Sequence, residues 1–217
     1  MALYPSPRNT PRRRHRFSPV LGLATAVVLL AGLAACNSTR VARVDPASVT
    51  DLSGRWNDAD SRLVASALIG QWLDADWATQ WAKSHGGRAP TVIIGGFANR
   101  TLEHIPVMTL TRDLERAYMS SGAVRIVASA DERQSVRVER ADQQSNALAA
   151  TRARTAMEQG AQFMLQGDVQ AIEDSQGREK AVTYQVDATL VDLESNAKVW
   201  VGQHRIKKVI DRRRIGW

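Results

Sequence analysis

The sequence contains a single cysteine among 217 residues, and only 6% of its residues are aromatic. One cysteine excludes an intramolecular disulfide and any cysteine-cluster metal site. Acidic side chains are missing from the first 35 residues. The long apolar run Val20–Leu33 is shorter than the ~20 residues that a membrane-spanning helix needs. The lack of acidic residues and the short apolar run indicate that residues 1–35 are a targeting sequence. A retained membrane anchor is the alternative.

The first 35 residues have the parts of an export signal. A basic stretch precedes the apolar run, and small residues follow it. Leu33-Ala34-Ala35-Cys36 resembles the bacterial lipobox, in which the cysteine thiol accepts a diacylglycerol and the peptide is cut just before it. We therefore predict a signal peptide over residues 1–35 and lipidation at Cys36. Asn37 stands where an aspartate usually retains such lipoproteins in the inner membrane, which favours the outer membrane.

The net charge of +7 describes mostly the signal. Removing residues 1–35 takes away five of the 29 basic side chains and none of the 22 acidic ones, which leaves +2. A nearly balanced, exported chain gives little support to a nucleic-acid partner. The remaining 182 residues suffice for one domain with a tether.

The patterning predicts a polar linker over residues 36–57 and an α/β domain over 58–209, followed by a basic tail over 210–217. Apolar spacing predicts helices over Asp58–Ser84, Val107–Ser121 and Ala147–Gln159, and a helical stretch that starts near Asp131 and gives way to a loop over 139–146. Alternating or β-branched runs predict strands over Thr91–Phe97, Val124–Ser129, Phe163–Glu173, Val182–Leu193 and Lys198–Val209. Ser175-Gln176-Gly177 and Glu194-Ser195-Asn196 read as hairpin turns.

This order predicts a single α/β (α+β) sandwich, in which helices cover one or both faces of a mixed sheet. The last three strands read as an antiparallel meander with one wet face, because apolar and polar residues alternate along them.

No catalytic constellation is visible in the sequence. It lacks a G-x-S-x-G elbow, and Gly95-Gly96 fits neither a phosphate loop nor a dinucleotide fingerprint. His85, His104 and His204 are isolated, which gives zinc little support. Glu103 beside His104 is an acid/base pair only if another acid joins them. We therefore predict a protein that is not an enzyme and has no cofactor, metal or small-molecule substrate.

Several segments in order resemble the penicillin-binding protein activator lipoprotein B family. They are TVIIGGF with Asn99-Arg100-Thr101, LTRDLERAYMSSG with VRIVAS, ARTAMEQGAQFMLQGDV, and VDLESNAKVWVGQHRIKK. The resemblance covers nearly all of residues 58–209. It implies a fold like the N-terminal domain of TolB, the Tol-system propeller protein, and an outer-membrane lipoprotein that binds and activates a bifunctional peptidoglycan synthase. The best-known members have a long proline-rich spacer, whereas here the spacer is only residues 37–57.

The loop after the first strand supplies the candidate partner contacts, because polar loop residues on a rigid sheet suit recognition. These contacts are Asn99, Arg100, Thr101, Glu103 and His104. An equal alternative is that Asn99 and Thr101 cap the turn. Two other functions stay open: a structural or assembly lipoprotein that binds another envelope protein or peptidoglycan without activating an enzyme, and an envelope hydrolase.

Overall fold

The computed structural model describes residues 41–211. The helices and strands described below lie in one compact unit, which begins at residue 46. Along the chain they are α2 (Asp58–Asp74), α3 (Trp77–Ser84), β1 (Thr91–Asn99), α4 (Val107–Ser121), β2 (Arg125–Val127), α5 (Ala130–Asn146), β3 (Phe163–Gln176), β4 (Glu179–Asp192) and β5 (Lys198–Asp211).

The five strands form one sheet in the order β2-β1-β3-β4-β5. β1 runs parallel to both β2 and β3, while β3, β4 and β5 pair antiparallel. The mixed sheet with a C-terminal meander is therefore confirmed. The first meander hairpin is longer than predicted, because Ser175 pairs with Lys180 as strand and the turn begins at Gly177. In the second hairpin β5 continues two residues past the predicted end, to Asp211.

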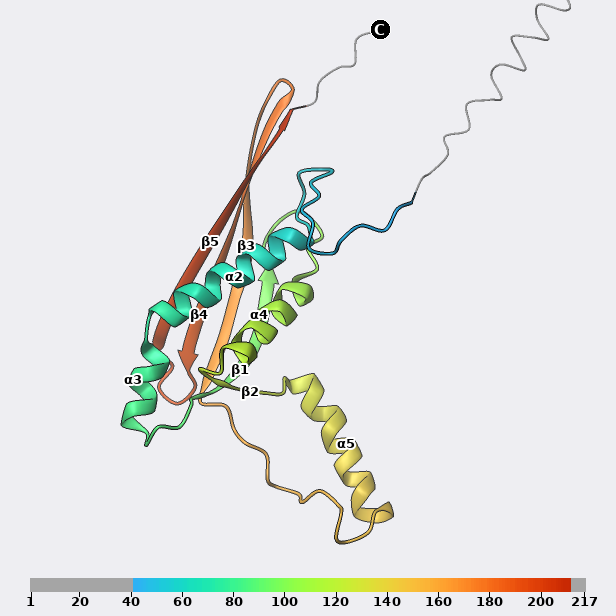
Figure 1. The fold of residues 1–217 in the computed structure, drawn as a ribbon, viewed down its shortest axis with the longest axis vertical. Coiled ribbons are helices and arrows are strands. Elements are labelled where there is room, and N and C mark those ends of the chain that lie inside the picture. The colour runs from blue at the N-terminus through green and yellow to red at the C-terminus, as the bar shows by residue number, and fades with distance from the viewer. Residues whose placement is uncertain (1–40, 212–217) are drawn as a thin grey trace, which may run out of the picture. The chain divides into compact units, whose positions relative to one another are not determined.

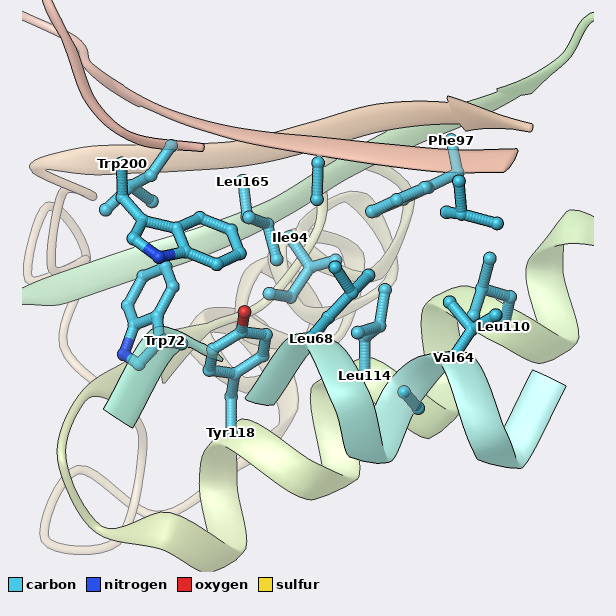
Figure 2. Close-up of a cluster of buried hydrophobic side chains, with 14 of the residues drawn as sticks. Val64, Leu68, Trp72, Ile94, Phe97, Leu110, Leu114, Tyr118, Leu165 and Trp200 are labelled. Carbon is cyan, nitrogen blue, oxygen red and sulfur yellow. The ribbon is translucent and has the colours of Figure 1, made fainter. Parts of the chain in front are cut away.

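One face of the sheet is covered by α2 and α4 (Figure 1). In β4 the residues Val182, Tyr184, Val186, Ala188 and Leu190 are buried, while their neighbours are half-buried. Figure 2 shows the resulting core, where Leu68 and Trp72 of α2 and Leu114 and Tyr118 of α4 meet Leu165 and Trp200 of the sheet. The alternation predicted for this strand is confirmed.

Helix α2 begins at a capping box. The Asn57 side chain accepts from the Asp60 N–H at 3.1 Å, and the Asp60 carboxylate accepts from the Asn57 N–H at 2.8 Å. The predicted helix over 58–84 is wrong in its length, because it breaks where Asp76 adopts a left-handed φ of 52°. The break turns α3 so that Trp77 packs edge-on against Trp72 and Phe163.

Helix α4 spans the predicted residues 107–121. Leu110, Leu114 and Tyr118 are its buried face. Gly122 follows in the left-handed region with φ 66°, where a glycine C-cap avoids the strain of a side chain.

The loop predicted over 139–146 is wrong, because α5 continues to Asn146. None of its residues is buried. Local polar bonds hold it instead: Ser129 and Glu132 form a capping box, and Gln143 donates to Glu139 at 3.0 Å. Such i, i+4 bonds stabilise a polar helix without an apolar stripe.

The helix predicted over 147–159 is also wrong. Residues 147–162 contain turns and irregular backbone, and Ala156 has a φ of 56°. The segment runs back along α5, held by ion pairs from Arg137 (2.8 Å) and Arg140 (2.9 Å) to Glu158. The Gln144 amide also donates to the Ala153 carbonyl at 2.7 Å. We call α5 with residues 147–162 the arm.

Candidate functional site

The loop of residues 99–106 joins β1 to α4 and is fixed at both ends. β1 pairs with a strand on each side. The Arg100 N–H continues this pairing by donating to the Val169 carbonyl at 2.8 Å. Ile105, only 3% exposed, anchors the other end in the core. The loop is therefore presented by a rigid part of the fold.

Asn99 and Thr101 use their polar groups inside this loop. The side-chain oxygen Oδ1 of Asn99 accepts from the Thr101 backbone N–H at 2.9 Å, and the side-chain nitrogen Nδ2 of Asn99 donates to the Glu103 carbonyl at 2.7 Å. The Thr101 hydroxyl accepts from the Glu103 N–H at 3.1 Å. These are the turn bonds that short polar side chains favour. The capping alternative thus describes what these two side chains do.

Glu103 joins three parts of the molecule. The buried hydroxyl of Tyr184 in β4 donates to Oε1 of Glu103 at 2.7 Å. The backbone N–H of Trp56 donates to Oε2 of Glu103 at 3.3 Å. The ring of Trp56 packs edge-on against Tyr184 at 5.5 Å. Burial raises the pKa of Tyr184 above its usual value, and the adjacent carboxylate adds to this. Glu103 therefore has a structural task.

The alternate side chains of the loop point outward. Arg100, Leu102 and His104 are exposed, and Leu102 is fully so. The loop thus offers a guanidinium, an isobutyl group and an imidazole to solvent. Leu102 was missed by the sequence reasoning, although an isolated leucine between polar loop residues is a signal that could have found it.

Arg100 also borders a shallow depression of about 330 Å³ on the open face of the sheet. Asp168 and Asp187 line it and lie opposite each other on β3 and β4. Asp187 accepts from the amides of Gln185 (2.7 Å) and Gln203 (2.8 Å). We call Arg100, Leu102, His104, Asp168 and Asp187 the docking surface.

The described residues 41–211 hold no group of three or more His, Cys, Asp or Glu side chains that could bind a metal. Within the same range no helix is long and apolar enough to cross a membrane. Glu103 is bound to Tyr184 and Trp56, while the neighbouring His104 is exposed. The site offers complementary charges and an apolar anchor, which suit binding.

Leu33, Ala34, Ala35 and Cys36 lie outside the described residues, as does the signal of residues 1–35. Most of the basic tail lies outside them too. Signal cleavage and lipidation therefore stay predictions.

Residues 51–57, the attachment segment, pack against the domain. Lys208 of β5 lies 2.7 Å from the carboxylates of both Asp51 and Asp60 and donates to the Arg55 carbonyl at 3.1 Å. Its side chain is 9% exposed and that of Asp60 is 4% exposed. Burial works to lower the pKa of Lys208, but the hydrogen bonds to Asp51 and Asp60 outweigh it and raise the pKa. No local sequence pattern indicates this pairing, because Asp51 and Asp60 lie 157 and 148 positions from Lys208.

Comparisons with known proteins show the family of this chain. The family described as "Peptidoglycan-synthase activator LpoB" matches residues 60–206. No curated protein matches the chain.

Among solved structures, the C-terminal domain of LpoB from Salmonella enterica is 17% identical, with 65% of this chain and 96% of that chain covered and a TM-score of 0.33. The NMR structure of Escherichia coli LpoB is 14% identical, with 98% and 96% covered and a TM-score of 0.35. Lipoprotein GNA1162 from Neisseria meningitidis is 15% identical, with 55% and 83% covered and a TM-score of 0.35. Because the family match spans more than half of the 217 residues, the chain belongs to the LpoB family of peptidoglycan-synthase activators.

Proposed function

We propose that this chain is an outer-membrane lipoprotein that binds a bifunctional peptidoglycan synthase in the periplasm and activates it. The family match over residues 60–206 carries the proposal. The lipobox at Leu33–Cys36 supports the location, since lipid chains on Cys36 would hold the domain at the membrane.

The docking surface is the proposed contact with the synthase. Arg100, Leu102 and His104 would meet the partner, because they are the exposed side chains of the loop. Asn99, Thr101 and Glu103 would act indirectly by holding the loop in shape. Leu102 would supply an apolar contact and Arg100 a charged one, and arginine is among the residue types that interfaces concentrate.

Activation needs no chemistry from this chain. A domain that binds the active conformation of a synthase more tightly than the inactive one shifts the population toward activity. Lipid anchoring would raise the local concentration of the domain beside its partner.

The reach of the tether sets which partners the domain can meet. Because residues 51–57 pack on the domain, only residues 37–50 lie between Cys36 and the first of these contacts. Fourteen extended residues span at most ~50 Å, and a flexible chain averages less. The synthase would therefore have to present a domain that projects toward the outer membrane.

That short reach favours a second candidate, a structural or assembly lipoprotein that binds another envelope protein near the outer membrane. Both candidates use the same docking surface. They differ in whether the bound domain changes the rate of glycan polymerisation.

The contact is tested with a double variant, Arg100→Ser with Leu102→Ser, in a chain of residues 37–217, which contains the whole compact unit of residues 46–217. Affinity for the purified synthase is measured by surface plasmon resonance. We expect a loss of at least tenfold, because the variant removes a charge and an apolar anchor while keeping every bond inside the loop. A control pair, Arg178→Ser with Val138→Ser, changes exposed residues away from the docking surface and should leave affinity unchanged. Equal affinity of both variants and the unaltered chain would remove the loop from the interface.

A further inference from the structure

A cavity of about 580 Å³ lies at the end of the sheet where β1 begins, beside the end of α3. Its volume falls in the range of ligand pockets. The residues that line it include Trp81, Arg88, Thr91, Arg125, Gln159 and Gln162. The cavity shares no residue with the docking surface.

Two exposed guanidinium groups give this cavity a positive charge. Arg88 lies between the turn that ends α3 and the start of β1, and Arg125 is the first residue of β2. No acidic residue lines the cavity, and within residues 41–211 neither arginine forms an ion pair. The Arg125 guanidinium donates to the side-chain oxygen Oε1 of Gln159 at 3.0 Å. The site is thus suited to an anion.

The amide side chains are held in place by Thr91, which is 3% exposed. The Thr91 backbone N–H donates to the side-chain oxygen Oε1 of Gln162 at 2.9 Å, and the Thr91 hydroxyl accepts from the side-chain nitrogen Nε2 of Gln159 at 2.9 Å. Within the described residues the side-chain nitrogen Nε2 of Gln162 has no hydrogen-bond partner, which leaves its two N–H donors for a ligand.

The C-terminal end of α3 would by itself attract cations. However, the last carbonyl groups of α3 already accept hydrogen bonds within the chain. The Ala82 carbonyl accepts from the N–H groups of His85 (3.0 Å) and Gly87 (2.8 Å), and the Trp81 carbonyl accepts from the Ser84 hydroxyl at 2.8 Å. His85 stacks on Trp81 with ring centroids 3.8 Å apart and forms an aromatic wall. The carbonyls at the end of α3 therefore do not cancel the attraction of this cavity for anions.

We propose that this cavity binds the carboxylate-bearing peptide of peptidoglycan. Guanidinium groups pair with carboxylates through charge-assisted hydrogen bonds, the amide donors match peptide carbonyls, and the aromatic wall packs against the rest of the ligand. The choice of peptidoglycan rests on the envelope location in the proposed function.

The position of the cavity allows it to act together with the docking surface. The cavity includes Thr91 at the start of β1, whereas the 99–106 loop follows its end (Figure 1). Nine strand residues separate the two sites by roughly 25–30 Å. The domain can thus hold the cell-wall polymer at one end and a synthase at the other.

The test uses residues 37–217 and isothermal titration with three probes. They are the disaccharide tetrapeptide released by muramidase, N,N′-diacetylchitobiose, which has no carboxylate, and tetraglutamate, which has no sugar. We expect saturable binding of the first, at least tenfold tighter than of either other probe. Arg88→Gln with Arg125→Gln should weaken it at least tenfold. The control pair Arg178→Gln with Lys207→Gln removes the same charge from exposed sites elsewhere and should stay within twofold.

Equal affinity for tetraglutamate would overturn the proposal and point to an acidic protein surface instead. Absence of saturable binding of the disaccharide tetrapeptide, or an unchanged affinity of the Arg88/Arg125 variant, would overturn it as well. No synthase is present in this assay, so its failure leaves the proposed activation untouched. Conversely, the Arg88/Arg125 variant should still bind the synthase with unchanged affinity.

Discussion

The helix-covered face of the sheet and the arm are stabilised by different forces. On that face Leu68, Leu110, Leu114, Leu165 and Leu190 are fully buried. In the arm α5 has no buried residue and is held by capping, amide bonds and the Glu158 ion pairs. Burial of a leucine side chain contributes ~1.5–3 kcal/mol, whereas exposed polar contacts contribute far less.

This difference shows where the domain can open without unfolding. Regions with few buried apolar contacts open at a small fraction of the global free energy. The cavity at Arg125 and Gln159 borders the arm, while the 99–106 loop is anchored in the core through Ile105. The docking surface is therefore the more rigid of the two sites.

Shortening one side chain in the core and one in the arm should change the free energy of unfolding by very different amounts. Leu68→Ala in the core should lower the free energy of unfolding by about 3–5 kcal/mol, because it leaves a cavity beneath α2. Val136→Ala on α5, where the side chain is 49% exposed, should change it by less than about 0.5 kcal/mol. Urea denaturation measures both. Similar losses would mean that the arm is packed in solution.

A second contrast compares ion pairs in the two regions. Lys208→Met should destabilise the domain by about 3 kcal/mol, because Asp60 would be left buried beside Asp51 without its cation. Arg137→Met removes an exposed contact to Glu158 and should leave the midpoint of thermal unfolding nearly unchanged. If Lys208→Met unfolded at the temperature of the unaltered chain, the attachment segment would not be fixed by this pair.

Two buried tyrosines of the core differ in whether the hydroxyl group has a hydrogen-bond partner. Tyr184→Phe removes the donor to Glu103 and should cost about 1–3 kcal/mol. Tyr118→Phe should be neutral or stabilising, since within the described residues its buried hydroxyl has no hydrogen-bond partner. Chemical denaturation of the two variants in parallel checks the order. A larger loss for Tyr118→Phe would contradict the hydrogen-bond assignment.

The smallest of these effects is a change in the local stability of the arm at low pH. Hydrogen bonds from Arg137 and then Arg140 lower the pKa of Glu158 from 4.5 to about 2. Because the folded pKa is below the unfolded one, this stabilisation is present above pH ~4.5 and is lost as the pH falls toward 2. The protection of amides across 137–158 against hydrogen exchange, taken relative to the intrinsic rate at each pH, should therefore fall in this range before that of the core strands does. Glu158→Gln should already show the reduced protection at neutral pH, and equal protection of the two chains at every pH would refute it.

Periodicity predicted the elements that bury an apolar face. Leu110, Leu114 and Tyr118 marked α4, and the alternation from Tyr184 to Leu190 marked β4. The arm was mispredicted because its residues carry no such signal. α5 depends on capping and i, i+4 bonds, and the alanine-rich segment 147–159 has high helix propensity but is not helical in the fold.

The candidate loop was found from sequence, but the division of its side chains was not. Whether Glu103 faces solvent or Tyr184 depends on a partner 81 positions away. The same holds for Lys208 and Asp60, and for the meeting of Arg88 and Arg125 at one cavity. Such pairs are set by sheet order, which local patterns do not specify.

The proposed activation is tested most directly by the rate of glycan polymerisation by the bifunctional synthase from the same organism. Residues 37–217 should raise this rate by about fivefold or more at saturation, as the usual size of allosteric coupling suggests. The Arg100→Ser, Leu102→Ser variant should need at least tenfold more protein for the same stimulation. An unchanged rate with a domain that demonstrably binds the synthase would contradict activation and leave the structural lipoprotein as the function.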